Sequence, residues 1–253
     1  MKDRISHIIF NLILLILCVF LGYMTFPDYN NPYDAQTTQE PMIDANQEWI
    51  VIITTCISPH GSNTKEDDIN YRKSLYEKQI KRWLEETNLP IFVVESSGYG
   101  FDNLLTSYKD KRKLVVVTFH QENDDKSTTI KERNSVRYLL DHIQTNDEYR
   151  NCKYVLKVTG KYFLEHFEDQ IPTFPKDKDM FLQKKRDENT KIQHCEFFGM
   201  RKELLPDFLD SIDKHIMERE LYDFSSRYSS EFIGPFVNTE KVNRGDGSVL
   251  ETL

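Results

Sequence analysis

The stretch "CKYVLKVTGKYFL", Cys152–Leu164, carries the strongest structural signal in the chain. It begins as a buried strand, with Tyr154, Val155 and Leu156, and then places polar and cationic residues where the apolar run would continue. A strand covered on both faces is apolar throughout, so the polar residues mark its carboxyl end. Ligands of open α/β sheets bind at the carboxyl ends of the strands. We therefore expect 157–162 to lie at a ligand-binding edge.

The rest of the chain repeats this alternation of short apolar runs with longer amphipathic segments. Strands separated by helices are typical of βαβ crossovers, so the predicted fold class is α/β, a mostly parallel, Rossmann-like sheet flanked by helices. We predict strands in 48–59, 89–100, 113–122, 152–164 and 179–185, helices in 67–88, 127–143 and 213–228, and a passage from strand or turn into helix in 196–212.

Composition limits both the architecture and the function. The chain has 253 residues, of which 39% are hydrophobic, enough for one substantial core. Its net charge of −8 lacks the basic footprint by which proteins neutralise nucleic-acid phosphates. We therefore expect one globular domain and no nucleic-acid partner.

The N-terminal region reads as a membrane anchor. Residues 8–26 are almost entirely apolar, and as a helix they would extend roughly 28 Å, about the thickness of the bilayer's hydrocarbon core. Lys2 and Arg4 precede them, and the next cation is Lys65, so the tail is expected in the cytosol and the remaining mass across the membrane. A cleaved signal peptide is the alternative. The predicted divisions are a cytosolic tail (1–7), a signal anchor (8–26), a flexible stem (27–47) and a domain (48–253).

Four predicted strand ends supply candidate ligand-binding residues. They carry Thr54, Thr55 and Ser58; Glu95; Thr118–Glu122; and Lys157, Thr159, Gly160, Lys161 and Tyr162.

Together these side chains suit a nucleotide diphosphate. The Glu95 carboxylate can accept hydrogen bonds from a ribose or a base edge. Lys157 and Lys161 can hold a diphosphate, Thr159 can donate a hydroxyl, and Gly160 lets the backbone approach a ligand closely. Taken singly, each also fits a solvated strand end or a turn.

At this point the chain resembles a family. An anchor, a stem and an α/β domain are similar to type II membrane glycosyltransferases of the GT-A fold. The ordered set "ESSGYG", "YVLKVTGKYF", "CEFFGMR" and "MERELYDF" resembles a glycosyltransferase-like group of microbes, protists and large viruses with a K-x-T-G-[RK]-Y signature. The resemblance covers 48–253. It implies transfer of a sugar from a nucleotide-diphosphate donor to a hydroxyl of a glycan.

The sequence departs from this fold's usual metal motif. Such enzymes usually place a DxD at the position occupied here by Lys157–Gly160, where its carboxylates bind Mn²⁺ or Mg²⁺. Lysine cannot ligate a hard cation, but it can neutralise a leaving diphosphate directly. We therefore expect no metal requirement, with Mn or Mg as the alternative. Asp177 and Asp179 form a literal DxD, but they precede a strand.

The resemblance also suggests candidate catalytic residues. It places Glu196 near the acceptor, where a carboxylate can take the proton of the acceptor hydroxyl. Glu218 is the second candidate, and His194 is a further possible base. Arg244, in a Gly-rich turn, is a candidate phosphate ligand on a loop over the donor.

The predictions leave two functions and one covalent link open. The alternative to a transferase is a non-catalytic, membrane-anchored domain that binds glycans or a partner. A hydrolase is disfavoured because neither a Gly-x-Ser-x-Gly elbow nor an HExxH motif occurs. The expected location is a type II membrane protein facing the Golgi or endoplasmic reticulum lumen, with another membrane as the alternative. If a disulfide forms there, the preferred pair is Cys152 with Cys195.

Overall fold

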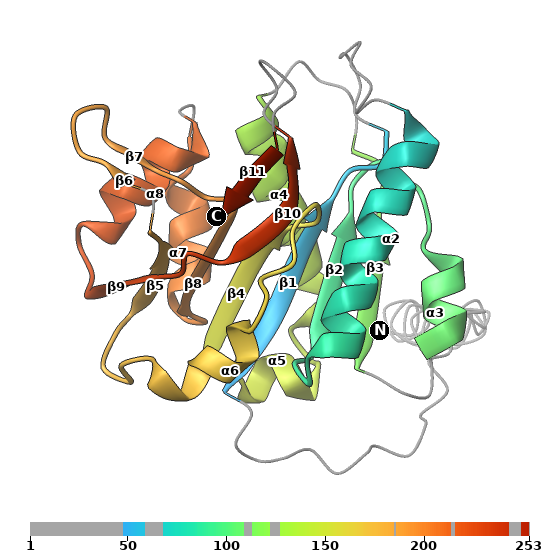
Figure 1. Cartoon of the computed structure of the whole chain (residues 1–253), viewed down its shortest axis with the longest axis horizontal. Helices are drawn as coiled ribbons and strands as arrows, with labels where there is room; N and C mark the ends of the chain where they lie inside the picture. Colours follow the sequence, from blue (N-terminus) through green and yellow to red (C-terminus); the bar gives the residue numbers. More distant parts are fainter. Residues whose placement is uncertain are drawn as a thin grey trace, which may run out of the picture. The chain divides into compact units, whose positions relative to one another are not determined.

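The described residues build one central sheet of seven strands, in the order β3-β2-β1-β4-β8-β5-β9 (Figure 1). Strands β3, β2, β1 and β4 pair in parallel, β8 is antiparallel to both of its neighbours, and β5 and β9 are parallel to each other. Their bounds are β1 Trp49–Thr55, β2 Ile91–Glu95, β3 Leu114–Thr118, β4 Tyr154–Thr159, β5 Met180–Gln183, β8 Phe197–Arg201 and β9 Ser230–Ile233.

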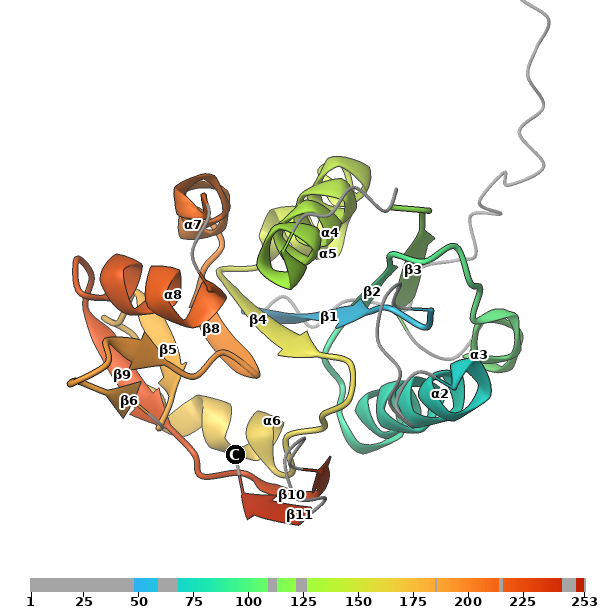
Figure 2. The same ribbon diagram turned by 90° about the horizontal axis from the view of Figure 1, so that it is seen from above.

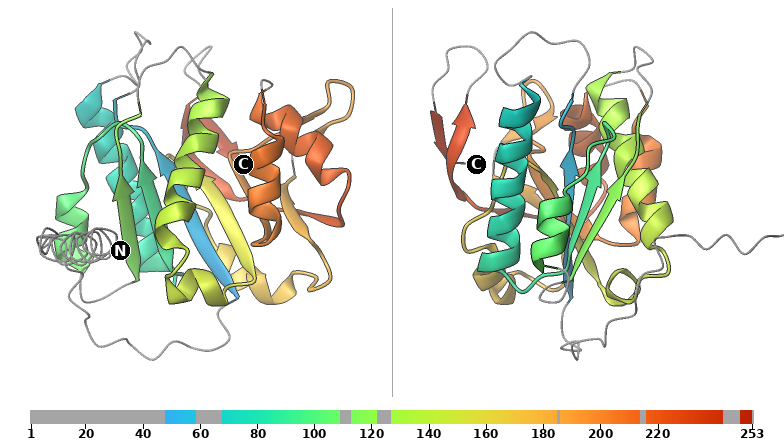
Figure 3. Two further views of the ribbon diagram at one scale, coloured as in Figure 1. Left: turned by 180° about the vertical axis from the view of Figure 1, so that it is seen from behind. Right: turned by 90° about the vertical axis from the view of Figure 1, so that its right-hand side faces the viewer.

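Helices cover both faces of this sheet. Figure 2 shows α2 and α4 on opposite sides of the strands, and the edge-on view in Figure 3 agrees. The helices are α2 (Ile69–Glu86), α3 (Asp102–Tyr108), α4 (Thr128–Ile143), α5 (Asp147–Asn151), α6 (Phe167–Gln170), the 3-10 turn η2 (Ile171–Thr173), α7 (Leu204–Ser211) and α8 (Met217–Ser225). Two hairpins complete the chain: β6 (Arg186–Asp187) with β7 (Ile192–Gln193), and β10 (Val237–Val242) with β11 (Val249–Thr252).

The structure is a computed structural model that describes residues 48–58, 68–108, 113–121, 127–184, 186–213, 216–242 and 249–252. These residues belong to one compact unit, Ile43–Leu253. The predicted tail, anchor and stem lie outside the described residues, as does Arg244. Within the described part of the chain, no helix is both long and apolar enough to cross a membrane.

Two apolar cores lie on the two faces of the sheet. Alternate residues of β1 point to opposite sides: Val51 and Ile53 pack with α2 residues, whereas Ile50 and Ile52 pack with α4, α7 and α8. This alternation places Lys157 on the α4 face, because its neighbour Leu156 belongs to the α2 face. A lysine buried in a strand therefore has to find its partner on α4.

The predicted α/β class is confirmed, and the strands and helices predicted from periodicity are present. The antiparallel strand β8 departs from simple βαβ repetition: it follows the β6–β7 hairpin rather than a crossover helix, so it enters the sheet from the carboxyl edge. This reversal brings the start of β8 beside the end of β4, where Val158 pairs with Phe197.

Register aligns the strand ends that the sequence singled out. Thr54 lies opposite Thr159, Thr55 lies opposite Glu95, and Glu95 in turn lies opposite Thr118. We call this edge of the sheet the carboxyl rim, defined by the ends of β1, β2, β3, β4 and β5 and the start of β8.

Candidate functional site

A buried ion pair occupies the carboxyl rim between β4 and α4. The Lys157 ammonium, on a side chain that is 1% exposed, forms an ion pair with Glu132 of α4. The Thr54 hydroxyl donates to the same Glu132 oxygen at 3.1 Å, and Lys157 donates to the Thr159 hydroxyl at 3.2 Å. The Phe198 ring lies 5.7 Å from the ammonium nitrogen. Four of the rim's polar groups are thus satisfied by one another.

This arrangement revises the expected role of Lys157. Its charge is compensated inside the protein by Glu132, a residue that the sequence interpretation had not considered. A neutralised, fully buried ammonium is a poor replacement for a metal ion at an exposed diphosphate. Lys157 fastens α4 to the end of β4, and it is Lys161, partly exposed in the following turn, that offers a cation at the rim.

The two candidate bases lie in the same region. Burial raises the pKa of the Cys195 thiol well above its usual range, Lys157 opposes this effect, and the carboxylates of Glu218, Glu132 and Glu196 add to it. The Met217 amide, next to Glu218, donates to the Thr129 hydroxyl at 3.2 Å, so the start of α8 lies beside the first turn of α4, which carries Glu132. The rim therefore brings together both predicted catalytic carboxylates.

Glu196 is held in place by the end of β4 and lies beside a histidine. Its carbonyl oxygen accepts from the Thr159 amide at 2.9 Å, which joins the start of β8 to the end of β4. Its carboxylate lies 3.7 Å from His194 Nδ1, and the side chain is 17% exposed. A half-buried carboxylate with a histidine beside it can exchange a proton with a bound hydroxyl.

The Glu95 carboxylate has a different role from the one expected. Glu95 is fully buried and accepts four hydrogen bonds: from the Ile57 amide (2.9 Å), the Ser97 hydroxyl (2.5 Å), the Ser97 amide (3.0 Å) and the Tyr99 amide (2.9 Å). A carboxylate has about four lone-pair sites, so none remains for a ribose. Glu95 instead fixes the loops that follow β1 and β2.

The threonines and the serine of the β1 end are likewise engaged by the protein. The Thr55 hydroxyl donates to the Val94 carbonyl at 3.0 Å. The Ser58 amide donates to the Ser97 hydroxyl at 2.9 Å. These bonds shape the loop without using the Ser58 hydroxyl, whose side chain is partly exposed.

A buried arginine that the sequence interpretation missed supports the same loop. Arg72, in the first turn of α2, donates to the Cys56 carbonyl at 2.8 Å and to the Tyr76 hydroxyl at 2.6 Å. Burial raises the pKa of Tyr76 to about 12, so this hydroxyl stays protonated at neutral pH. Arg72 therefore places a positive charge directly behind the loop at the end of β1.

Gly160 is required by close packing rather than by an exposed ligand surface. A Cβ at this position would lie 2.6 Å from Thr55 Cγ2 and 3.0 Å from both the Thr54 carbonyl and Tyr76 Cδ1. The Gly160 amide donates to the Thr54 carbonyl at 2.8 Å. Tyr162 is buried in the α2-side core, and its carbonyl accepts from Trp83 Nε1 at 3.1 Å. Of the signature residues, Thr159 and Lys161 are partly exposed, and Lys161 is the charged one of the two.

The alternative metal residues lie at the opposite end of the sheet. Asp179 directly precedes β5, at that strand's amino end, where it pairs with Arg201 at 3.0 Å and accepts from the Ser229 hydroxyl at 2.7 Å. The alternative metal residues Asp177 and Asp179 are therefore separated from the carboxyl rim by the length of the sheet. Among the residues that the structure describes, no group of three or more His, Cys, Asp or Glu side chains is placed to hold a metal.

The preferred disulfide is also wrong. Cys152 precedes β4 and Cys195 precedes the antiparallel β8, so they lie at opposite ends of these paired strands. Both are free thiols, as is Cys56. Burial raises the pKa of Cys152 to about 12.

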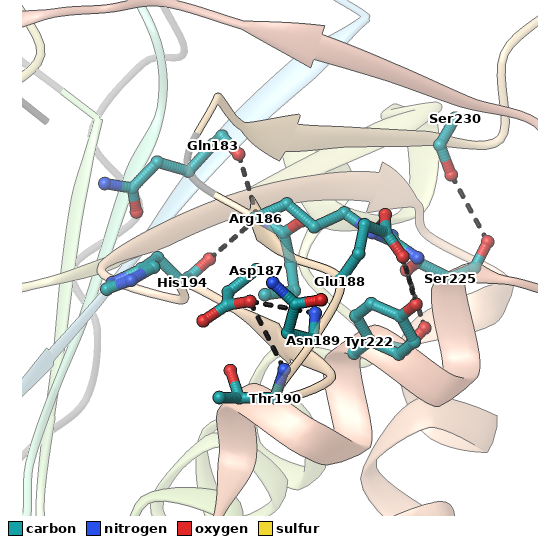
Figure 4. A network of polar contacts seen from close by, with 11 residues as sticks. Gln183, Arg186, Asp187, Glu188, Asn189, Thr190, His194, Tyr222, Ser225 and Ser230 are labelled. Carbon is teal, nitrogen blue, oxygen red and sulfur yellow. Dashed lines mark hydrogen bonds and ion pairs between the residues drawn. The ribbon is translucent and has the colours of Figure 1, made fainter.

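A polar network ties the β6–β7 hairpin to α8, which carries Glu218 (Figure 4). The Arg186 guanidinium stacks on the Tyr222 ring at 3.9 Å and donates to Glu188 at 2.7 Å and Ser225 at 3.3 Å. The Tyr222 hydroxyl donates to Glu188, and this bond lowers the pKa of that carboxyl. The network fixes α8 against the hairpin that leads into His194 and Glu196.

A pocket of about 750 Å³ lies away from these groups, at the amino ends of the strands. Its lining includes Trp49, Tyr154 and Phe181 beside Pro172 and Phe174. Trp49 and Tyr154 open β1 and β4, so the pocket and the carboxyl rim are at opposite ends of the sheet. The pocket also has charged and polar lining residues, Glu48, Asn88, Glu168 and Lys176. The strand ends singled out by the sequence and the candidate bases lie at the rim, and we place the candidate site there.

The missed residues share a detectable signal. Glu132 precedes Val136 by one helical turn and so falls in phase with the apolar stripe of α4, and Arg72 stands in the same relation to Tyr76 in α2. A charged residue on the apolar stripe of a helix is expected to meet a buried partner. Both do so here, near the end of β1: Glu132 contacts Thr54 from the α4 face, and Arg72 contacts the Cys56 carbonyl from the α2 face.

Comparisons with known proteins identify no family for this chain. No protein-family model matches it, and no curated protein matches it. The solved structures to which it is similar include three of low sequence identity. They are a provisionally assigned nucleotide-diphospho-sugar transferase from Desulfovibrio desulfuricans G20 (9% identity, 74% of this chain and 80% of that one, TM-score 0.46), a cytidylyltransferase from Leptospira borgpetersenii (14%, 74% and 76%, 0.42) and a glycosyltransferase involved in glycosylation of the major capsid of PBCV-1 (6%, 73% and 80%, 0.42). At these identities and TM-scores we carry no activity over from them.

Proposed function

We propose that the domain 48–253 is a glycosyltransferase that moves a sugar from a nucleotide-diphosphate donor to a hydroxyl of a glycan, without a required metal. The observation that carries the proposal is the convergence at one rim of two half-buried carboxylates, Glu196 and Glu218, with a cationic turn at Lys161. The resemblance of the ordered motifs to type II glycosyltransferase-like proteins points the same way. In this proposal, residues 8–26 anchor the domain on the lumenal side of a Golgi or endoplasmic reticulum membrane.

The rim divides into two chemical halves in this proposal. The loops after β1 and β2, backed by Arg72 and fixed by Glu95, take the nucleotide. Lys161 and the backbone beside Gly160 face the diphosphate. The acceptor binds on the β8 side, where carboxylates can accept hydrogen bonds from sugar hydroxyls.

The proposed transfer needs one proton acceptor and one stabilised leaving group. The Glu196 carboxylate removes the proton of the acceptor hydroxyl while the oxygen of that hydroxyl forms a bond to the anomeric carbon of the donor sugar. The bond from that carbon to the diphosphate breaks, and the diphosphate leaves with the electron pair. Lys161 stabilises the negative charge that develops on it.

Thermal stabilisation by nucleotides tests the donor half. Ligands that bind only the folded protein raise its Tm. We expect one nucleoside diphosphate and its sugar derivatives to do so in EDTA as well as in Mn²⁺. A shift that requires Mn²⁺ would contradict the metal-independent form, and no shift with any nucleotide would contradict the donor assignment.

Two single substitutions test the assigned residues. Lys161→Ala removes a charge-assisted contact worth about 1.5–3 kcal/mol, so the donor Kd should rise by about 10- to 150-fold. Lys176→Ala, an exposed lysine at the other end of the sheet, is the matched control and should leave the Kd unchanged. Glu196→Gln should abolish transfer and retain the donor-induced Tm shift.

The buried Lys157–Glu132 pair favours a second candidate, a non-catalytic glycan-binding domain, because it leaves the rim fewer available cations than the sequence predicts. Transfer of radiolabelled sugar to a glycan by wild type, lost in Glu196→Gln, would exclude it. A glycan-induced Tm shift in a protein that binds no nucleotide would support it.

A further inference from the structure

The rim holds a buried polar side chain whose amide group forms no hydrogen bond within the described protein. Gln183, the last residue of β5, is 0% exposed, and within the described residues neither its amide nitrogen nor its amide oxygen has a hydrogen-bond partner. Leaving a buried amide unpaired costs free energy, and buried polar side chains almost always have partners. An unsatisfied amide at the ligand edge of a sheet is therefore a group prepared for a ligand.

The backbone of Gln183 is fixed, which sets the face of the sheet to which its side chain belongs. Its carbonyl oxygen accepts from Gln193 Nε2 at 2.8 Å, and its strand is paired on both sides, with β8 and with Ile233 of β9. Figure 4 shows the Gln183 amide and the His194 ring extending to the same side, away from the Arg186 network. His194 is the neighbour of Glu196, the proposed base.

The chemistry of a carboxamide narrows the ligand. It offers N–H donors and a carbonyl acceptor side by side. A phosphate only accepts and an ammonium only donates, so either would leave half of the amide unsatisfied. Two neighbouring hydroxyls of a sugar ring both donate and accept, and they satisfy both halves while adding no charge.

We propose that Gln183 binds two neighbouring hydroxyls of the acceptor sugar and so determines which glycan the site accepts. This inference rests on the proposed function, which places the acceptor on the β8 side of the rim beside Glu196. A sugar seated on Gln183 and next to His194 and Glu196 presents its reactive hydroxyl to the base.

The test uses Gln183→Met, which keeps the length of the side chain and removes its donor and acceptor. If the amide has no protein partner, this substitution should not lower the Tm of the ligand-free, full-length chain. The matched control is Gln193→Met. Gln193 is equally buried, but its amide donates to the Gln183 carbonyl at 2.8 Å and to the His194 carbonyl at 3.1 Å. The Tm of the Gln193→Met variant should therefore fall by several degrees.

Binding is measured with a panel of methyl glycosides of hexoses and pentoses as probes. We expect at least one glycoside to raise the Tm of wild type and of Gln79→Met, a buried glutamine of α2 that serves as the binding control. In Gln183→Met the affinity for that glycoside should fall about 30-fold, the loss of two hydrogen bonds of about 1 kcal/mol each.

Three results would overturn the inference: a Tm of Gln183→Met as low as that of Gln193→Met, a wild-type glycoside response retained in Gln183→Met, or no glycoside response in wild type. The donor proposal fails separately, when nucleotides give no shift. A protein that responds to glycosides through Gln183 but to no nucleotide would keep this sugar site and lose the transferase.

Discussion

The Lys157–Glu132 pair makes a quantitative prediction, because its two members are buried to different degrees. The Lys157 side chain is 1% exposed, whereas that of Glu132 is 26% exposed. Removing one member of a buried pair costs about 3–5 kcal/mol, since the other is left as an uncompensated buried charge. The cost should therefore depend on which member remains.

Glu132→Gln leaves the ammonium buried, beside the Thr159 hydroxyl at 3.2 Å and the Phe198 ring at 5.7 Å, and neither contact compensates its charge. We expect a loss of about 3 kcal/mol, the lower end of the range, because Glu132 is partly solvated. Lys157→Met leaves a carboxylate that water and the Thr54 hydroxyl can still solvate, and should cost about 1 kcal/mol. The double variant should be more stable than Glu132→Gln, because no buried charge remains.

Urea unfolding followed by circular dichroism gives these free energies, and thermal unfolding gives a second measure. For a domain of this size, 1 kcal/mol corresponds to roughly 2–4 °C in Tm, so Glu132→Gln should lower the Tm by about 6–12 °C. A Glu132→Gln variant as stable as wild type would refute the reasoning. It would mean that Lys157 does not depend on Glu132 and is free to meet a ligand, as the sequence alone had suggested.

Further predictions concern packing, titration and stacking. Gly160→Ala should cost about 1–3 kcal/mol by overpacking against Thr55, whereas Gly100→Ala, which meets only the movable Asp102 side chain at 3.1 Å, should cost less; unfolding in urea compares them. The Cys152 thiol, with its pKa raised to about 12, contributes stability that is fully present below the unfolded value of about 8.5 and is lost as pH rises toward 12, so the unfolding free energy should fall more steeply above pH 9 in wild type than in Cys152→Ala. Arg186→Lys keeps the charge but loses planar stacking at 3.9 Å over Tyr222, and should lower stability by about 1 kcal/mol in thermal unfolding; an unchanged Tm would show that the network does not hold the hairpin.

The periodicity of apolar residues predicted the elements, because each of these strands and helices buries one or both faces and its buried positions are occupied by apolar residues. The end of β4 was predictable for this reason: a buried strand that turns polar has reached the edge of its sheet. The short hairpin β6–β7 left no such record, since two residues per strand cannot define a period.

The roles of the site residues were less predictable, because they depend on partners distant in sequence. Lys157 and Glu95 were correctly placed at the rim, yet one is neutralised from α4 and the other is saturated by two loops. Gln183 carries no motif at all. Only the pairing of β5 with its neighbours, and the burial that follows, shows that its amide is unsatisfied.

The four hydrogen bonds to Glu95 join the loops after β1 and β2 through a single carboxylate. The amides of Ile57, Ser97 and Tyr99 therefore share one acceptor group. When the loop after β1 opens, the Glu95 carboxylate loses a hydrogen bond, and the same carboxylate holds the loop after β2. The exchange of these amides with solvent deuterium should therefore be correlated. Any molecule that orders one of these loops will slow exchange in both.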